Sequence, residues 1–239
     1  KTKFKLIFSI NKKDYAFLNK SEPHFKKFLK SNKMICKTIN VKNRLSEKDK
    51  GKIKNSYFNT LNNEQNLSFI LKICSKLGIK KNIIFGVVNN FKALNFRQQT
   101  IYDSKVLRII NDSKSTSFSS SINLLKNFNR IFWILGGLPK KGDKFKFQNK
   151  NKIRKIYIYG KNKSFFIKFF KNKFKYSQFH DLDQAVQRAS IDINKDKKVK
   201  KINLLFSPCA ASFDKFKNFE ERGEYFNHLI NRYKIKNVR

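Results

Sequence analysis

The chain has 239 residues, which is enough for one large domain or two smaller ones, each able to bury a core. Apolar residues make up 40% and aromatic residues 15%, so a disordered chain is excluded despite the high charge. The net charge of +39 suggests RNA or an anionic membrane as a partner, but only nine of the 55 basic residues are Arg, and Lys is spread along the whole chain as a compositional bias of the gene would leave it.

The first hundred residues are predicted to hold two strands and two helices. Phe4 to Ile10 and Tyr15 to Leu18 are short β-rich runs. Apolar residues then recur at helical spacing before Gly78, which is a C-terminal stop signal: Leu67, Ile70, Leu71, Cys74 and Leu77. A second helix is expected from about Lys81 to Phe91, where the β-branched residues leave a strand as the alternative.

From about residue 100, short β-branched runs alternate with longer amphipathic stretches. Four strands are expected, at Val106–Ile110, Ile131–Leu135, Ile156–Tyr159 and Ile202–Phe206. The helical stretches between and after them carry Phe118, Ile122 and Leu125, then Phe165 to Phe170, then Ala185, Val186 and Ala189, and last Phe216, Phe219, Phe226, Leu229, Ile230 and Tyr233. This alternation predicts an α/β domain with a doubly wound, mainly parallel sheet. We place the domain boundary near Gln98 to Asp103.

The cysteines and the apolar runs indicate which kinds of protein the chain is not. Cys36, Cys74 and Cys209 are isolated and form no CxxC pair, which argues against a disulfide framework or a metal site and suits a reducing cytosol. The longest apolar run, Ile131 to Leu135, is far shorter than the ~20 residues that span a bilayer. We therefore expect a cytoplasmic protein without a membrane span.

Polar segments follow three of the predicted strands. Ligands of such sheets bind beyond the carboxyl ends of the strands, so Asn111–Thr116, Gly136–Lys140 and Ser207–Ser212 should meet at one edge. Asn111 to Thr116 precedes a helix, whose positive end can hold an anion, although capping by Ser or Thr is the commoner reason for such residues. Asp112 and Lys114 in this loop offer an acceptor for a sugar hydroxyl and a cation for a phosphate.

Other features of these segments are weaker signals. The pair Gly136-Gly137 permits a sharp turn, and Lys140 is one lysine among many, so its position is the evidence. Cys209 has no nearby His that would activate it as a nucleophile, and we interpret it as a packing residue.

Taken together, these segments resemble the Mur ligases. The matching stretches are Asn111–Thr116, Gly136–Lys140 and Ser207–Gly223, and the last resembles most specifically the members that add D-glutamate. Upstream, Asn63–Asn66 and Leu94–Arg97 resemble the family's adenine-contacting and interdomain arginine segments. The resemblance covers most of the chain and is weakest before residue 55.

The resemblance implies a fold and a reaction. Residues 1–98 would be the tail end of a P-loop-type α/β ATPase domain, and residues 99–239 a Rossmann-like C-terminal domain. The enzyme would be an ATP-dependent ligase of peptidoglycan biosynthesis. By this resemblance it would phosphorylate the carboxylate of UDP-N-acetylmuramoyl-L-alanine, and the amine of D-glutamate would then attack the acyl phosphate.

The resemblance also implies roles for individual residues. ATP and Mg²⁺ would be required, with the Mg²⁺ ligands largely outside this chain. Asn63 and Asn66 would contact adenine, Arg97 and Asp112 would bind the ribose and phosphates, and Lys114 would act in catalysis at the phosphoryl end. D-glutamate would be held by Thr116, Lys140, Ser212, Phe213 and Phe219.

Departures from the family pattern set limits on these expectations. The sequence contains no G-x-x-x-x-G-K-[ST] phosphate loop and nothing like the nucleotide-sugar domain or the modified lysine of the family, and Lys1 is not Met. We therefore expect an incomplete chain that is inactive alone. We also expect it to be a monomer. Asn62 stands where His is common, and Cys209-Ala210-Ala211 varies the usual Ala-Cys-Ala order.

Two other functions remain open. A basic RNA-binding protein, for instance a ribosome-associated one, would carry clustered Arg and exposed aromatic rings, whereas the Phe residues here mostly fall on core-like helix faces. We therefore expect no specific nucleic-acid partner. A stand-alone module that binds an amino acid or a protein without catalysis is the third possibility.

Overall fold

The structure, a computed structural model, describes residues 9–31, 34–147, 149–196 and 200–237. The chain divides into two compact units, Lys1–Lys92 and Ala93–Arg239. The boundary region inferred from sequence, Gln98 to Asp103, contains the first strand of the second unit. The strand expected at Phe4 to Ile10 lies almost entirely outside the described residues.

The first unit combines a small parallel sheet with short helices. Strands β1 (Tyr15–Leu18) and β2 (Lys37–Asn40) pair in parallel, with helix α2 (Pro23–Ser31) between them in sequence. There follow α3 (Glu47–Lys50), the 3-10 turn η1 (Ser56–Asn59), α4 (Leu61–Lys76) and α5 (Lys81–Asn90). Both predicted helices are confirmed, and the alternative of a strand at α5 is wrong. Gly78, with φ of 76°, follows the end of α4 as expected.

Helices α4 and α5 bury a core of their own. The buried residues are Leu45, Phe58, Leu67, Leu71, Ile84, Phe85 and Val88. Asn89 at the end of α5 accepts a hydrogen bond from the backbone N–H of Lys54 (2.8 Å) and donates to the carbonyl of Lys52 (3.0 Å). The irregular segment before η1 is thereby held against α5.

The second unit is built on a six-stranded sheet in the order β3-β4-β8-β5-β6-β7. The strands are β3 (Gln99–Asp103), β4 (Leu107–Asn111), β5 (Ile131–Gly136), β6 (Ile153–Tyr159), β7 (Tyr176–Phe179) and β8 (Ile202–Phe206). Every pairing is parallel except that of β3 with β4, which is antiparallel. The predicted doubly wound, mainly parallel sheet is confirmed.

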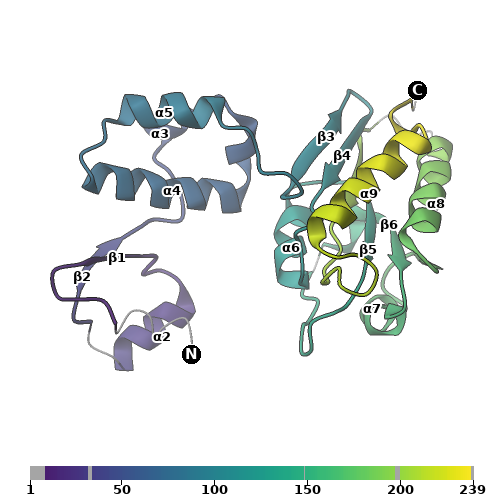
Figure 1. The fold of residues 1–239 in the computed structure, drawn as a ribbon, viewed down its shortest axis with the longest axis horizontal. Helices are drawn as coiled ribbons and strands as arrows, with labels where there is room; N and C mark the ends of the chain where they lie inside the picture. The colour runs from purple at the N-terminus through teal and green to yellow at the C-terminus, as the bar shows by residue number, and fades with distance from the viewer. Residues whose placement is uncertain (1–8, 32–33, 148, 197–199, 238–239) are drawn as a thin grey trace. The chain divides into compact units, whose positions relative to one another are not determined.

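Helices cover both faces of this sheet (Figure 1). α8 (Leu182–Lys195) and α9 (Phe219–Arg232) pack on one face, where they meet alternate strand residues such as Phe132, Ile134 and Leu204. α6 (Phe118–Lys126) and α7 (Lys163–Phe170) cover the other, over Trp133, Leu135 and Leu205. Two 3-10 turns complete the fold, η2 (Lys150–Lys152) and η3 (Ile235–Asn237). Parallel strands buried on both faces read as continuous apolar runs, which is why they stand out in the sequence.

Candidate functional site

The carboxyl ends of three neighbouring strands meet, as predicted. β8 lies between β4 and β5 and runs parallel to both, so the segments that follow these strands leave the sheet at the same edge. The N–H of Asp112 donates to the carbonyl of Phe206 (2.7 Å), and the N–H of Gly136 donates to the carbonyl of Pro208 (3.2 Å). Leu138 and Ala211 exchange two backbone hydrogen bonds of 2.9 Å each. We call these joined segments the strand-end loops: residues 111–117, 136–142 and 207–218.

Asp112 is a buried carboxyl group in the first of these loops. Its oxygens accept hydrogen bonds from the Ser207 hydroxyl (2.8 Å) and from the N–H of Gln98 (3.1 Å). Burial raises the pKa of Asp112 to about 7, because desolvation outweighs these donors and the positive charges of Arg97 and Arg222. The carboxyl group is therefore poised to change its protonation state near neutral pH.

Lys114 and Phe219 are brought together from distant parts of the sequence. The Lys114 ammonium lies 3.8 Å from the centre of the Phe219 ring, a cation–π contact. The backbone of Lys114 is fixed as well, since its N–H donates to the carbonyl of Phe96 (3.0 Å). Phe219 begins α9, where the side chain of Asn218 caps the helix by accepting from the N–H of Glu221 (2.8 Å).

Arg222 joins two of the strand-end loops to α9. This fully buried guanidinium donates to the hydroxyl of Ser113 (3.0 Å), the carbonyl of Ser113 (2.6 Å) and the carbonyl of Ala210 (3.0 Å). The Ser113 hydroxyl in turn donates to the carbonyl of Phe219 (2.8 Å). Sequence reasoning gave Arg222 no role. Its position four residues before the core residue Phe226, on the buried side of the helix, is the signal that could have identified it.

Asn111 makes a second link between the first loop and α9. Its amide nitrogen donates to the carbonyl of Gly223 (2.9 Å) and to the side-chain oxygen of Asn227 (2.8 Å). Its own oxygen accepts from the N–H of Ser113 (3.1 Å) and so shapes the turn that leads to Lys114.

Gly136 and Gly137 are required by close approach of the backbone. Both have positive φ, 155° and 123°. A Cβ at Gly136 would lie 2.3 Å from the carbonyl oxygen of Tyr159, and one at Gly137 would lie 2.5 Å from that of Ala211. Only glycine permits the loop after β5 to press against its neighbours, so the pair does more than form a turn.

A chain of small side chains fills the space beneath the loops. The Ser121 hydroxyl lies 2.5 Å from that of Ser115 and 2.6 Å from that of Ser207. The thiol of Cys209 donates to the Ser121 hydroxyl (2.9 Å). Cys209 is buried, and burial raises the pKa of its thiol. The interpretation of Cys209 as a packing residue is confirmed.

The other candidate residues of the second unit differ in exposure. Ser212 is buried, and its carbonyl accepts from the N–H groups of Lys215 (3.2 Å) and Phe216 (2.9 Å). Thr116, Lys140 and Phe213 are exposed, Phe213 by 72%. Among the residues that the structure describes, no hydrogen bond or ion pair joins these three side chains to Lys114. Arg97 is also exposed, and its charge acts on Asp112.

The two candidate adenine contacts lie on helix α4 of the first unit. Asn63 and Asn66 are three residues apart and so share one side of the helix. Asn63 is buried, and its amide nitrogen donates to the carbonyl of Tyr57 (2.8 Å). Asn66 is exposed.

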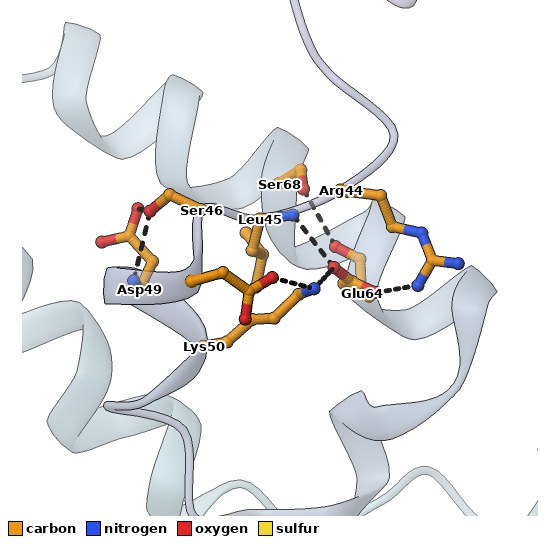
Figure 2. Close-up of polar contacts among 8 residues, drawn as sticks. Arg44, Leu45, Ser46, Asp49, Lys50, Glu64 and Ser68 are labelled. Atoms are coloured by element: carbon orange, nitrogen blue, oxygen red, sulfur yellow. Dashed lines mark hydrogen bonds and ion pairs between the residues drawn. The ribbon is translucent and has the colours of Figure 1, made fainter.

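Between these two residues stands a buried carboxylate that sequence reasoning missed. Figure 2 shows Glu64 held by the Arg44 guanidinium (2.8 Å), the Lys50 ammonium (3.5 Å) and the N–H of Leu45 (3.0 Å). Burial favours the neutral acid, but these donors and charges outweigh it and lower the pKa of Glu64. Glu64 therefore anchors the first turn of α4, the turn that carries Asn63.

The described part of the chain contains neither a membrane-crossing helix nor a metal-binding cluster. None of its helices has the length and apolar character that crossing a membrane requires. Nor do three or more His, Cys, Asp or Glu side chains gather there in a way that could hold a metal ion.

Comparison with known proteins relates the chain to one family. It is 32% identical over 180 residues to the UDP-N-acetylmuramoylalanine–D-glutamate ligase of Rickettsia bellii, covering 75% of this chain and 40% of that protein. The enzymes of the same name from Agrobacterium fabrum (34% identity over 69% of this chain and 35% of that protein) and Prochlorococcus marinus (35% over 71% and 37%) match similarly. The chain thus spans well under half the length of these relatives. No protein-family model matches it.

Solved structures agree in fold. The MurF ligase of Thermotoga maritima, in complex with ADP, matches with a TM-score of 0.58 at 13% identity, over 97% of this chain and 56% of that one. MurF of Acinetobacter baumannii matches with a TM-score of 0.52 at 14% identity, over 71% and 38%. By sequence and fold the chain is a homologue of part of the Mur ligases. Within that family, its sequence relatives are the ligases that add D-glutamate.

Replacement of Arg222 by an apolar residue should destabilise the second unit. We expect Arg222→Met to lower the free energy of unfolding by about 3 kcal/mol, because two buried carbonyls lose their donor. Urea unfolding followed by the fluorescence of Trp133, the single tryptophan, measures this. Arg188→Met, the same exchange at an exposed position of α8, is the control and should cost less than ~1 kcal/mol. Equal effects would contradict the role of Arg222.

The raised pKa of Asp112 predicts that the free energies of unfolding of the native chain and of Asp112→Asn differ by an amount that depends on pH. The folded state holds the Asp112 proton more tightly than the unfolded state, so ionisation costs stability as pH rises from about 4 to about 7. Over this range the native chain should lose on the order of 4 kcal/mol relative to Asp112→Asn. Unfolding curves of both proteins at matched pH values test this, and a difference that does not change with pH would refute the raised pKa.

Glu64→Gln should loosen α4 at neutral pH. The lowered pKa means that ionised Glu64 contributes stability above its ordinary value of 4.5, and that this contribution is lost as pH falls further. We expect amide hydrogen exchange in α4 to quicken about tenfold in Glu64→Gln at pH 7, which is the loss of ~1.4 kcal/mol. Glu47→Gln, which changes an exposed carboxylate bound to the same lysine, serves as the control and should leave exchange unaltered.

Proposed function

We propose that the chain is part of an ATP-dependent ligase that joins D-glutamate to UDP-N-acetylmuramoyl-L-alanine in peptidoglycan biosynthesis. In this proposal, residues 1–98 are the C-terminal part of the ATP-binding domain and residues 99–239 the C-terminal domain. The sequence likeness to relatives named for this reaction supports it. The three free cysteines suit a reaction in the reducing cytoplasm.

The observation that carries the proposal is the grouping of Lys114, Asp112 and Phe219 at the carboxyl ends of the strands. A phosphoryl transfer needs cations placed where negative charge develops, and little other chemistry from the protein. The ammonium of Lys114 is held over Phe219 and is backed by a loop whose backbone is fixed at both ends. Such a fixed cation could neutralise charge on the transferred phosphoryl group without first reorganising.

The described residues also offer groups that fit ATP. Asn63 has an amide oxygen that makes no hydrogen bond among the described residues, as suits an adenine amino group. Arg97 is exposed beside Asp112, where its guanidinium could bind phosphate oxygens while the carboxyl group bonds to a ribose hydroxyl. When bound, ATP would supply the phosphoryl group and Mg²⁺ would neutralise its charge, with ligands that we assign largely to parts of the enzyme beyond these residues.

D-glutamate is assigned to the outer side of the strand-end loops. In the proposed mechanism Lys140 faces one carboxylate, while the hydroxyls of Thr116 and Ser212 and the rings of Phe213 and Phe219 fix the rest of the molecule. The exposure of Thr116, Lys140 and Phe213 leaves them accessible to such a ligand. In the proposed reaction the substrate carboxylate takes the γ-phosphoryl group of ATP and ADP leaves. The amine of D-glutamate then attacks the acyl phosphate and displaces inorganic phosphate, and Lys114 would stabilise the charge of the tetrahedral intermediate.

Removal of the Lys114 ammonium tests the proposal. In the active ligase that contains this chain, Lys114→Ala should lower turnover by about 10² to 10³, the scale of losing one transition-state donor. Lys126→Ala, at an exposed position of α6, is the matched control and should leave turnover unchanged. Ligation assays with ATP, D-glutamate and the nucleotide-sugar substrate measure both variants. An undiminished rate in Lys114→Ala would remove Lys114 from the mechanism.

A further inference from the structure

A cavity of about 790 Å³ lies at the opposite end of the second unit's sheet from the strand-end loops. It is lined where β5, β6 and β7 begin, by Phe132, Ile153 and Lys175, and by the last turn of α8, which contributes Asp192 and Lys195. Because these strands are parallel, their amino ends are separated from their carboxyl ends by the length of the sheet. We call this cavity the amino-end pocket.

The amino-end pocket is strongly basic. Six cationic side chains line it, and two carboxylates: Lys150, Arg154, Lys155, Lys173, Lys175 and Lys195, with Asp192 and Asp196. Its lining is drawn from four separate segments: the start of β5, the region around the start of β6, residues 173–175 and the end of α8. A basic lining of this kind raises the local concentration of anions.

The two carboxylates are already neutralised by the protein. Asp192 accepts from Lys155 (2.7 Å), from Arg188 (3.1 Å) and from the hydroxyl of Tyr157 (2.9 Å). Asp196 pairs with Arg130 and, at 3.9 Å, with Arg154. Four cationic side chains thus pair with the two carboxylates. Neither carboxylate is left to balance the charge of the remaining lysines.

Four lysines of the pocket are left over. Lys150, Lys173, Lys175 and Lys195 are exposed, and within the described ranges they form no ion pair. Like charges that share one hollow repel one another, and a multivalent anion would relieve that repulsion at several points at once. Lysine binds phosphate as a point charge and lacks the planar, two-pronged guanidinium of arginine. A set of lysines therefore selects a ligand by its negative charge more than by its shape.

The aromatic residues beside the pocket argue against an RNA ligand. Phe145, Phe147 and Phe174 line a neighbouring hollow of about 370 Å³. The Phe145 ring packs against those of Phe147 (6.0 Å between ring centres), Phe174 (5.9 Å) and Phe170 (5.1 Å). These three rings are partly buried and pack against the core and against one another, so they are not presented as free stacking platforms for bases.

We propose that the amino-end pocket binds a compact anion that carries several phosphate groups, either free polyphosphate or the polyphosphate end of a nucleotide. The volume suits a small ligand, since such sites commonly measure ~300 to 1,000 Å³. The pocket and the strand-end loops occupy opposite ends of the sheet, so this site stands apart from the proposed ligase chemistry and does not depend on it.

Calorimetric titration of the 239-residue chain with tripolyphosphate tests the proposal. We expect a saturable site at the pocket. The pocket variant, in which Lys150, Lys173, Lys175 and Lys195 are all changed to Gln, should weaken binding at this site at least about tenfold. The control changes four exposed lysines outside the pocket, Lys26, Lys80, Lys105 and Lys126, to Gln and removes the same charge. It should weaken binding less than about threefold. Thermal unfolding of both variants confirms that they fold.

Several results would overturn the proposal. If the pocket variant and the control variant weakened tripolyphosphate binding equally, the effect would be a general one of net charge. If the native chain showed no saturable binding, the pocket would not be a binding site. Loss of binding in Lys114→Ala would place the anion at the strand-end loops instead. A further contrary result is that the native chain binds a short single-stranded RNA and not tripolyphosphate. If the four pocket substitutions then abolished RNA binding and the control substitutions did not, RNA would be the ligand.

Titration with ATP in parallel distinguishes the two sources of phosphate. The chain could bind ATP and tripolyphosphate with equal affinity, and the pocket variant could lower both affinities equally. This result would show that the pocket recognises the phosphates alone. Tighter binding of ATP that is likewise lowered in the pocket variant would identify a nucleotide as the ligand. Both results support the pocket as a polyphosphate site.

Discussion

The arrangement of the strand-end loops depends on one buried cation. Arg222 reaches from α9 to the loops after β4 and β8, and its donors meet carbonyls that would otherwise be buried without partners. A buried charge is costly unless it is hydrogen-bonded, and the bonds of this guanidinium go through Nε and one terminal nitrogen. It therefore stabilises the fold only while both loops keep their present course. Lys114, one residue beyond Ser113, takes its place from that constraint.

The parallel sheet distributes chemistry between its two ends. At the carboxyl ends, the loops bury a carboxyl group, small hydroxyl side chains and a thiol in a dense hydrogen-bonded cluster. At the amino ends, the carboxylates of Asp192 and Asp196 are held in ion pairs, and exposed lysines remain. The same sheet thus holds an ordered, buried polar cluster at one end and an open basic pocket at the other.

The elements foreseen from the sequence are those whose burial leaves a continuous apolar pattern. β4, β5, β6 and β8 are buried on both faces and were all predicted, whereas β3 and β7 are edge strands, mostly half-buried or exposed, that carry no such run. α2 and β2 were missed for a similar reason, because charged and polar residues interrupt them. Phe216 and Tyr233 were placed in the last helix but flank it, since helical spacing does not reveal the cap at Asn218.

The candidate site was foreseen in outline only. Polar runs after strands are visible in the sequence, and parallel topology brings their ends together. The bonds of Arg222 to Ser113 and of Asn111 to Gly223 join residues 109 and 112 positions apart, so no local pattern announces them. The burial of Glu64 could not be predicted from the sequence for a different reason. A carboxylate near the start of a helix is common on surfaces, and its burial depends on Arg44 and Leu45 from another segment.

The hydrogen bond from Gln98 to Asp112 couples two parts of the chain. Gln98 follows the junction between the units, and Phe96 and Gln98 both adopt positive φ, 61° and 49°. An ionised carboxylate accepts that bond more strongly than a neutral acid. A ligand that brings charge to the strand-end loops will therefore shift the proton equilibrium of Asp112. Its binding will be linked to proton uptake or release near neutral pH, and the strength of the hydrogen bond from Gln98 will change with the same proton.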